Sequence, residues 1–213
     1  MENETLKYII DKYQLDINQE VMPIEIPNTG RDDLPVLFQK LGFKVGVEVG
    51  VLKGCYAEQF LQANGALKLY AVDPWKRTDG FLDFSNRTLE KSYRSARKRL
   101  EKYNCELVRK TSMEALNDFQ DNSLDFVYLD GDHTFKNVVL DICGWIKKVK
   151  IGGILSGHDF RRYVEENRSH VPQAVEGYTD SYHIKPWFVL GRKHAEPGEI
   201  RDKERSWMWV KTK

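Results

Sequence analysis

The sequence has few cysteines, no long hydrophobic run and almost no excess of charge of either sign. Its three cysteines, Cys55, Cys105 and Cys143, are widely spaced and form no C-x-x-C pair. We therefore expect reduced, buried thiols, and neither a disulfide framework nor a thiolate metal site. No apolar run approaches the length of a membrane span, and the polar first residues contain no signal-peptide core. These absences predict a cytoplasmic protein.

The net charge of +1 gives the chain no overall attraction to nucleic acid or to a membrane surface. The basic segment 89–103 also contains acidic residues and an apolar stripe, which is typical of a solvated helix face. With 213 residues the chain is long enough for one domain with a hydrophobic core. We predict a single domain over 1–213, with a helical cap over 1–41 and an α/β core over 42–213.

The most informative pattern is a pair of apolar runs that each end in acidic and histidine residues. The first run leads into Asp130-Gly-Asp-His133, and the second leads into Gly157-His-Asp159. The segment between them has apolar residues at three- and four-residue steps, which predicts a crossover helix. Parallel neighbouring strands bring such residues to one sheet edge, where ligands bind in open α/β sheets. The residues expected there are Asp130, Asp132, His133, His158 and Asp159.

A glycine turn upstream indicates a nucleoside site. A buried-strand pattern is followed by Gly50 and Gly54, and the next predicted strand ends at Asp73. In this layout the glycines let the backbone approach a ligand, and the terminal acid accepts hydrogen bonds from a ribose diol. The spacing departs from the full G-x-G-x-x-G pattern of dinucleotide sites. Glu48 would repel a pyrophosphate but suits a cationic cofactor.

The rest of the chain predicts a mostly parallel α/β sheet with helices on both faces. Aromatic runs at 185–191 and 206–211 predict a carboxyl-terminal antiparallel hairpin, and the stretch 21–30 predicts a loop. The segment before the first strand is expected to cap the cofactor or substrate site. Strands are expected near 45–49, 68–72, 105–109, 124–129 and 151–156, and helices near 3–13, 33–41, 55–63, 86–103, 112–118 and 135–149.

The connection 74–85 is too long for an ordinary turn and is typical of a lid or binding loop. Trp75 at its start either stacks on a bound adenine or packs against the following helix. We expect the acceptor pocket to come from residues 1–40, from the 74–88 loop and from the 160–185 segment.

Taken in order, Glu48-x-Gly50, Asp73, Asp130-Gly-Asp-His133 and Gly157-His-Asp159 resemble the motifs of class I S-adenosylmethionine-dependent methyltransferases. Over residues 40–160 the chain is similar to bacterial small-molecule O-methyltransferases of the macrocin type, whose fourth-strand motif reads D-G-D-H. The resemblance implies a Rossmann-like methyltransferase sheet. It also implies an S-adenosylmethionine site formed by Glu48, Gly50, Asp73, Trp75, Ser112, Met113 and Asp130. Ser112 and Met113 would flank the adenine, and Ser112 also suits the N-cap of a helix.

Similarity to the metal-dependent catechol-type O-methyltransferases implies a divalent cation, Mg²⁺ or Mn²⁺, held by Asp130, His158 and Asp159. A histidine at 158, where those enzymes have an aspartate, suits Mn, Fe or Zn better than Mg; alternatively His158 bonds only to backbone. His133 stands at the offset of their general-base lysine, so His133 and Asp130 are the expected catalytic residues. The alternative for His133 is a local backbone contact, and Asp132 would orient His133, support the metal or cap the helix.

We therefore predict an enzyme that transfers a methyl group from S-adenosylmethionine to a hydroxyl of a small molecule, with no nucleic-acid or membrane partner. The fourth strand lacks the N-P-P-Y run expected for amino-group methylation of DNA bases or glutamine. Two other hypotheses stay open. One is an NAD-type oxidoreductase on a Rossmann sheet, and the other is a non-catalytic binding module on a methyltransferase fold. The aromatic tail would suit a homodimer contact.

Overall fold

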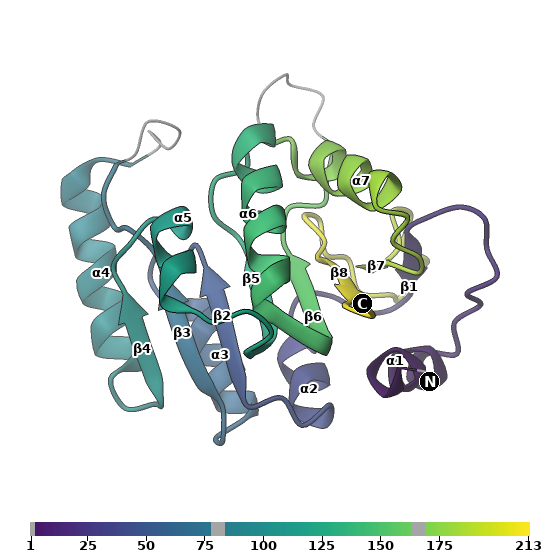
Figure 1. The fold of residues 1–213 in the computed structure, drawn as a ribbon, viewed down its shortest axis with the longest axis horizontal. Coiled ribbons are helices and arrows are strands. Elements are labelled where there is room, and N and C mark those ends of the chain that lie inside the picture. Colours follow the sequence, from purple (N-terminus) through teal and green to yellow (C-terminus); the bar gives the residue numbers. More distant parts are fainter. Residues whose placement is uncertain (1–2, 78–83, 163–168) are drawn as a thin grey trace.

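The computed structural model describes residues 3–77, 84–162 and 169–213, which form one eight-stranded sheet with helices on both faces (Figure 1). The strand order is β1-β7-β8-β6-β5-β2-β3-β4. The strands are β1 (Ile24–Ile26), β2 (Val45–Val49), β3 (Lys68–Val72), β4 (Cys105–Val108), β5 (Leu124–Leu129), β6 (Val149–Gly157), β7 (Phe188–Leu190) and β8 (Trp207–Val210). The helices are α1 (Glu4–Tyr13), α2 (Asp33–Lys40), α3 (Cys55–Ala63), α4 (Asn86–Leu100), α5 (Ser112–Ala115), the 3-10 helix η1 (Leu116–Asp118), α6 (Phe135–Lys148) and α7 (Val171–Ser181).

The sheet is mostly parallel, and β8 is the strand that runs against its neighbours β6 and β7. Trp207 and Trp209 on β8 are buried, which fits the preference of aromatic side chains for a covered strand. The predicted carboxyl-terminal antiparallel pair is confirmed, as is the predicted α/β sheet. None of the helices in the described residues is long and apolar enough to cross a membrane.

The sheet separates two layers of hydrophobic core. Every residue of β5 is buried, because its side chains alternate between the two layers. Phe126 and Tyr128 contact Phe60 of α3, on the face that α2, α3 and α4 cover. Residues Val127 and Leu129 belong to the opposite layer, which α6 and α7 cover. The strand–helix–strand unit β5-α6-β6 is therefore held from both sides, and its carboxyl end is fixed.

Gly50 follows β2 directly and packs against the backbone at the end of the neighbouring strand β5. Its φ of +90° is in the left-handed region, and a Cβ at this position would lie 2.0 Å from the Asp130 carbonyl oxygen. Only glycine fits this backbone without displacement. The turn after β2 therefore lies directly against the end of β5, where Asp130 begins the predicted site.

Several expectations about individual segments and residues were wrong. Part of the predicted loop 21–30 forms β1, which pairs in parallel with β7 at the sheet edge. Helix α7 lies in a segment for which no helix was expected, and its buried residues include Val171, Ala174 and Val175. Cys55, in the first turn of α3, is exposed, and Cys105 and Cys143 are only partly buried, so the expectation of buried thiols was wrong.

Helix α1 lies away from the carboxyl ends of the strands. The Thr5 hydroxyl donates a hydrogen bond of 2.7 Å to the Gly152 carbonyl, in the first half of β6. The cluster at Asp159 follows the other end of that strand. The expectation that the whole segment before β2 caps the site was therefore wrong for α1.

Replacing Thr5 by valine tests this placement of α1. The change removes one partly buried hydrogen bond, so we expect the free energy of unfolding to fall by about 1 kcal/mol. Affinity for a nucleoside cofactor should not change. Urea unfolding and calorimetry measure the two quantities, with the exposed Ser181→Ala as the matched loss of a hydroxyl. A changed cofactor affinity in Thr5→Val would contradict the placement.

Candidate functional site

A cavity of about 570 Å³ opens at the carboxyl ends of β2, β3 and β5. This is the sheet edge at which open α/β proteins bind ligands. The cavity brings together six of the predicted site residues. They are Gly50, Asp73, Ser112, Met113, Asp130 and His133. Asp132 also lines the cavity, and its Oδ1 accepts a hydrogen bond from the Thr134 amide. The N-cap of α6 is Thr134, so the suggestion that Asp132 caps this helix was wrong.

Asp73 is held rigidly at the end of β3. Its Oδ2 accepts a hydrogen bond of 2.9 Å from the Leu52 amide, and its Oδ1 accepts one of 2.6 Å from the Trp75 amide. Burial raises the pKa of Asp73, while these backbone hydrogen bonds act in the opposite direction. The carboxylate is therefore preorganised next to the glycine turn, with its remaining acceptor capacity available in the cavity.

Trp75 and Glu48 do not line the cavity. Trp75 is 1% exposed, and its indole N–H donates to the Leu52 carbonyl while its ring meets Tyr93 of α4 edge-on at 5.1 Å. The structure therefore favours packing against the following helix over stacking on adenine, because a φ of +43° at Trp75 turns its side chain into the core. Glu48 is buried, and burial raises its pKa well above the usual value. Its Oε2 accepts no hydrogen bond from the described residues.

Ser112 begins α5 but is not its N-cap. Thr111 is the N-cap, and it forms a capping box with Glu114. The N-cap prediction was therefore wrong by one residue, and the Ser112 hydroxyl has other partners. It donates a hydrogen bond of 2.5 Å to Oδ1 of Asp141 and accepts one of 2.8 Å from the Trp145 indole.

Asp141 is a site residue that the sequence analysis did not identify. It lines the cavity from α6 although it is only 6% exposed. Burial raises its pKa to about 7, the Ser112 hydrogen bond acts against this, and Asp132 adds to it. A signal was present in the sequence, because Asp141 lies on the same helical face as Val138 and Trp145, where an apolar residue is expected.

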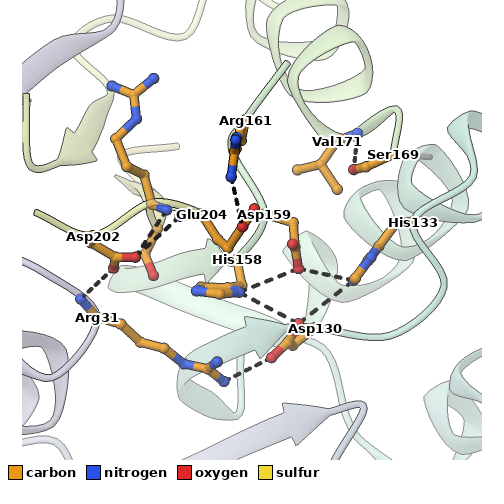
Figure 2. A network of polar contacts seen from close by, with 12 residues as sticks. Arg31, Asp130, His133, His158, Asp159, Arg161, Ser169, Val171, Asp202 and Glu204 are labelled. Atoms are coloured by element: carbon orange, nitrogen blue, oxygen red, sulfur yellow. Dashed lines mark hydrogen bonds and ion pairs between the residues drawn. The ribbon is translucent and has the colours of Figure 1, made fainter. Parts of the chain in front are cut away.

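Four residues form what we call the acid–histidine cluster: Asp130, His133, His158 and Asp159. Figure 2 shows both imidazoles directed at the two carboxylates. His133 Nε2 lies 3.3 Å from Asp159 Oδ2 and 3.6 Å from Asp130 Oδ1. His158 Nδ1 lies 3.2 Å from Asp159 Oδ2 and 3.9 Å from Asp130 Oδ1. The predicted convergence of these residues at one sheet edge is therefore observed.

The cluster can offer a set of metal ligands. One ligand atom each from Asp130, His133 and Asp159 lies within 4.8 Å of the others. His158, the histidine of the predicted set, lies beside this group, and its Nδ1 contacts the Asp159 side chain, so the alternative that it bonds only to backbone was wrong. His133 Nε2 is buried and has no hydrogen bond among the described residues, as expected for an atom that awaits a ligand. Two carboxylates with imidazole suit a borderline divalent metal.

Opposite charges inside the cluster shift the pKa values of His133 and Asp159. Burial lowers the pKa of His133, but Asp130 and Asp159 outweigh it, so the pKa is raised. Burial raises the pKa of Asp159, but His158 and His133 outweigh it, so the pKa is lowered. Asp159 also has a φ of +56°, a conformation that non-glycine residues adopt mainly at turns and functional sites. The Asp159 carboxylate therefore stays ionised and is held in a fixed geometry.

Arg31 is a second residue that the sequence analysis missed. Its Nη2 donates a hydrogen bond of 2.7 Å to Oδ2 of Asp130, and its guanidinium lies 3.9 Å from the Tyr56 ring centroid (Figure 2). Oδ1 of Asp130 is thereby turned toward the histidines. Arg31 comes from the loop before α2, so no local pattern connects it with a site that follows β5.

Residues 47–160 match the family model of a methyltransferase domain, which is more than half of the chain. The chain belongs to the methyltransferase family. This confirms the class I methyltransferase resemblance, and the match spans β2 to the residue after Asp159. A curated relative from Sinorhizobium fredii, the uncharacterized protein y4gI, is 27% identical over 116 residues. The alignment covers 54% of this methyltransferase but only 12% of y4gI.

Solved structures share the fold. An O-methyltransferase from Bacillus cereus in complex with SAH aligns with a TM-score of 0.62 at 14% identity, over 100% of this methyltransferase and 92% of that chain. The O-methyltransferase TomG from Streptomyces achromogenes, involved in tomaymycin synthesis and in complex with SAM, aligns with a TM-score of 0.60 at 12% identity over the same shares. A protein from Staphylococcus aureus that is assigned as a caffeoyl-CoA O-methyltransferase aligns with a TM-score of 0.58 at 13% identity, over 99% of this chain and 92% of that chain.

Proposed function

We propose that this methyltransferase transfers the methyl group of S-adenosylmethionine to a hydroxyl of a small molecule, with a divalent cation held by the acid–histidine cluster. One observation carries the proposal: a single cavity joins Asp73 to Asp130 and His133. The O-methyltransferases of similar fold that are described with SAH or SAM support the choice of cofactor.

The cavity fits the cofactor in size and in chemistry. Its volume is in the range of small-molecule sites. Asp73 presents a fixed carboxylate to a ribose diol, and Gly50 leaves the backbone open beside it. Asp130 places negative charge at the far end, where a sulfonium would be stabilised.

The acid–histidine cluster also fits a divalent cation. Asp130 Oδ1, Asp159 Oδ2 and His133 Nε2 would hold it, with His158 beside them. A divalent cation held there would supply a Lewis acid that lowers the pKa of the acceptor hydroxyl and orients it. Arg31 positions Asp130 by occupying its other oxygen. As a ligand, His133 uses the same Nε2 that would accept a proton, so its roles as ligand and as general base exclude each other.

Positioning is the main contribution of the chain's own residues. Methyl transfer is an in-line displacement, so the hydroxyl has to lie against the methyl carbon before it reacts. Asp130 and His133 line one end of the cavity, Asp159 lies beside His133, and backbone hydrogen bonds hold Asp73 in another part of the same cavity. Residues 78–83 and 163–168, parts of the predicted lid and acceptor pocket, lie outside the described residues.

Calorimetric titration with S-adenosylhomocysteine and then with Mn²⁺ tests the proposal. We expect wild type to bind both, and Asp73→Ala to bind S-adenosylhomocysteine about 30-fold more weakly, because charged hydrogen bonds to the ribose are lost. Loss of the Mn²⁺ signal in His133→Ala but not in His158→Ala would assign His133 as a ligand, and the reverse would leave it as the base. Absence of S-adenosylhomocysteine binding in folded wild-type protein would overturn the proposal.

A further inference from the structure

We propose that Asp141 recognises the adenine of the cofactor, with its Oδ2 accepting a hydrogen bond from the exocyclic amino group. The chain would then discriminate against nucleosides that have an oxygen at that position. The inference rests on the proposed cofactor and adds a specificity-determining residue to its site.

The position of Asp141 in the cavity supports this role. Asp73, which faces the ribose, ends β3, and Ser112 follows β4, the next strand outward. The acid–histidine cluster follows β5 and β6, on the other side of β2. A cofactor with its sulfonium near Asp130 and its ribose at Asp73 therefore places its base beside Ser112. Asp141 contacts Ser112 directly and lines the same cavity.

One carboxylate oxygen of Asp141 is held by a hydrogen bond and the other is not. The Trp145 indole donates to Ser112 Oγ, and Ser112 Oγ–H donates to Asp141 Oδ1. This chain of two hydrogen bonds fixes the plane of the carboxylate. Oδ2 accepts no hydrogen bond from the described residues, and it lies beside Gly131, another residue that lines the cavity.

Burial of an acid at this position costs free energy. Asp141 is 6% exposed, and no cation among the described residues is paired with it. A buried carboxyl with one hydroxyl partner destabilises the folded chain, so packing alone does not explain it. Such groups are concentrated at functional sites. A ligand that brings an N–H donor to Oδ2 would satisfy the unpartnered oxygen, and the exocyclic amino group is the N–H donor of the adenine.

The experiment compares S-adenosylhomocysteine with S-inosylhomocysteine, in which an oxygen replaces the exocyclic amino group. Dissociation constants are measured by calorimetry for wild type, for Asp141→Asn and for Asp121→Asn, an exposed carboxylate outside the cavity that pairs with Lys148. A site that requires a donor rejects the analogue that lacks it, so wild type should prefer the adenine ligand at least about tenfold. Asparagine keeps the shape but can donate to the oxygen, so Asp141→Asn should bring the ratio of the two constants close to one.

Each outcome is decisive. An unchanged ratio in Asp141→Asn overturns the inference, and so does an equal affinity of wild type for both ligands. A ratio that falls equally in Asp121→Asn also overturns it. Failure of wild type to bind S-adenosylhomocysteine overturns the proposed cofactor, which is a different result. If Asp141→Asn does not fold, Ser112→Ala, which releases the Asp141 carboxylate, should lower the ratio in the same direction by a smaller factor.

Discussion

Asp130→Asn is expected to lower kcat/KM for methyl transfer by on the order of 10³, while affinity for S-adenosylhomocysteine stays within about tenfold of wild type. The change keeps the volume of the side chain and removes its charge. The cluster then has one carboxylate, Asp159, to hold a cation and to balance two histidines. Single-turnover rates with a saturating acceptor and cofactor binding by calorimetry separate the two effects.

The ion pair with Arg31 provides the matched control. Arg31→Gln breaks the same 2.7 Å contact but leaves the Asp130 carboxylate in place. If the carboxylate itself matters, Arg31→Gln should retain at least about a tenth of the activity, since it loses a positioning contact only. Equal losses in the two variants would show that the ion pair is what activity requires. Activity of Asp130→Asn within tenfold of wild type would refute its assigned role.

Stability should depend on pH in a way that identifies Asp141. In the folded chain its pKa is raised to about 7, whereas an unfolded aspartate has a pKa of about 3.9. Between these values the unfolded chain releases the proton and the folded chain keeps it, so rising pH favours the unfolded state. We expect wild type to lose stability relative to Asp141→Asn from about pH 4 to about pH 7, and the difference to be constant above. At about 1.4 kcal/mol per pKa unit, its upper bound is about 4 kcal/mol.

Urea unfolding of cofactor-free protein across this range measures the effect. Asp121→Asn is the control, because the Lys148 ion pair lowers the pKa of Asp121. Replacing Asp121 should change the pH dependence of stability in the opposite direction. Because its pKa is lowered in the folded chain, any stability that Asp121 contributes is present above the unfolded pKa and is lost as the pH falls through the folded pKa. A difference between wild type and Asp141→Asn that does not vary with pH would show that the carboxyl of Asp141 is not buried as described.

The sequence was sufficient for the parts of the site that follow directly from buried strands. β2, β3 and β5 have apolar runs whose ends are marked by glycine or aspartate, and the ends of parallel strands meet at one edge. For this reason Gly50, Asp73 and Asp130 were placed correctly in one cavity. The side chains of Trp75 and Ser112 were less predictable, because their direction depends on one backbone torsion and on one residue of helix register.

The contribution of Arg31 could not be predicted, since it reaches across 99 residues of sequence to Asp130 and its loop has no periodic pattern. Strand β1 has only three residues, and it pairs with β7, which itself has three. Such short edge strands are formed through tertiary pairing, since their own propensity is weak. Asp141 was predictable in principle, because a single acid on the apolar face of a helix conflicts with the period around it.

The place of β8 in the sheet constrains the order in which a growing chain can acquire its structure. β8 lies between β6 and β7, and β7 in turn is the strand that pairs β1. Until the ribosome has added residues 207–210, the outer edge of β6 lacks its partner β8. The segment that becomes β1 is made long before its partner β7. The parallel half, from β6 through β4, needs nothing from beyond residue 157 for its pairing. The nascent protein can therefore assemble its cofactor-binding half first, and contacts of long sequence separation make the other half the slower one.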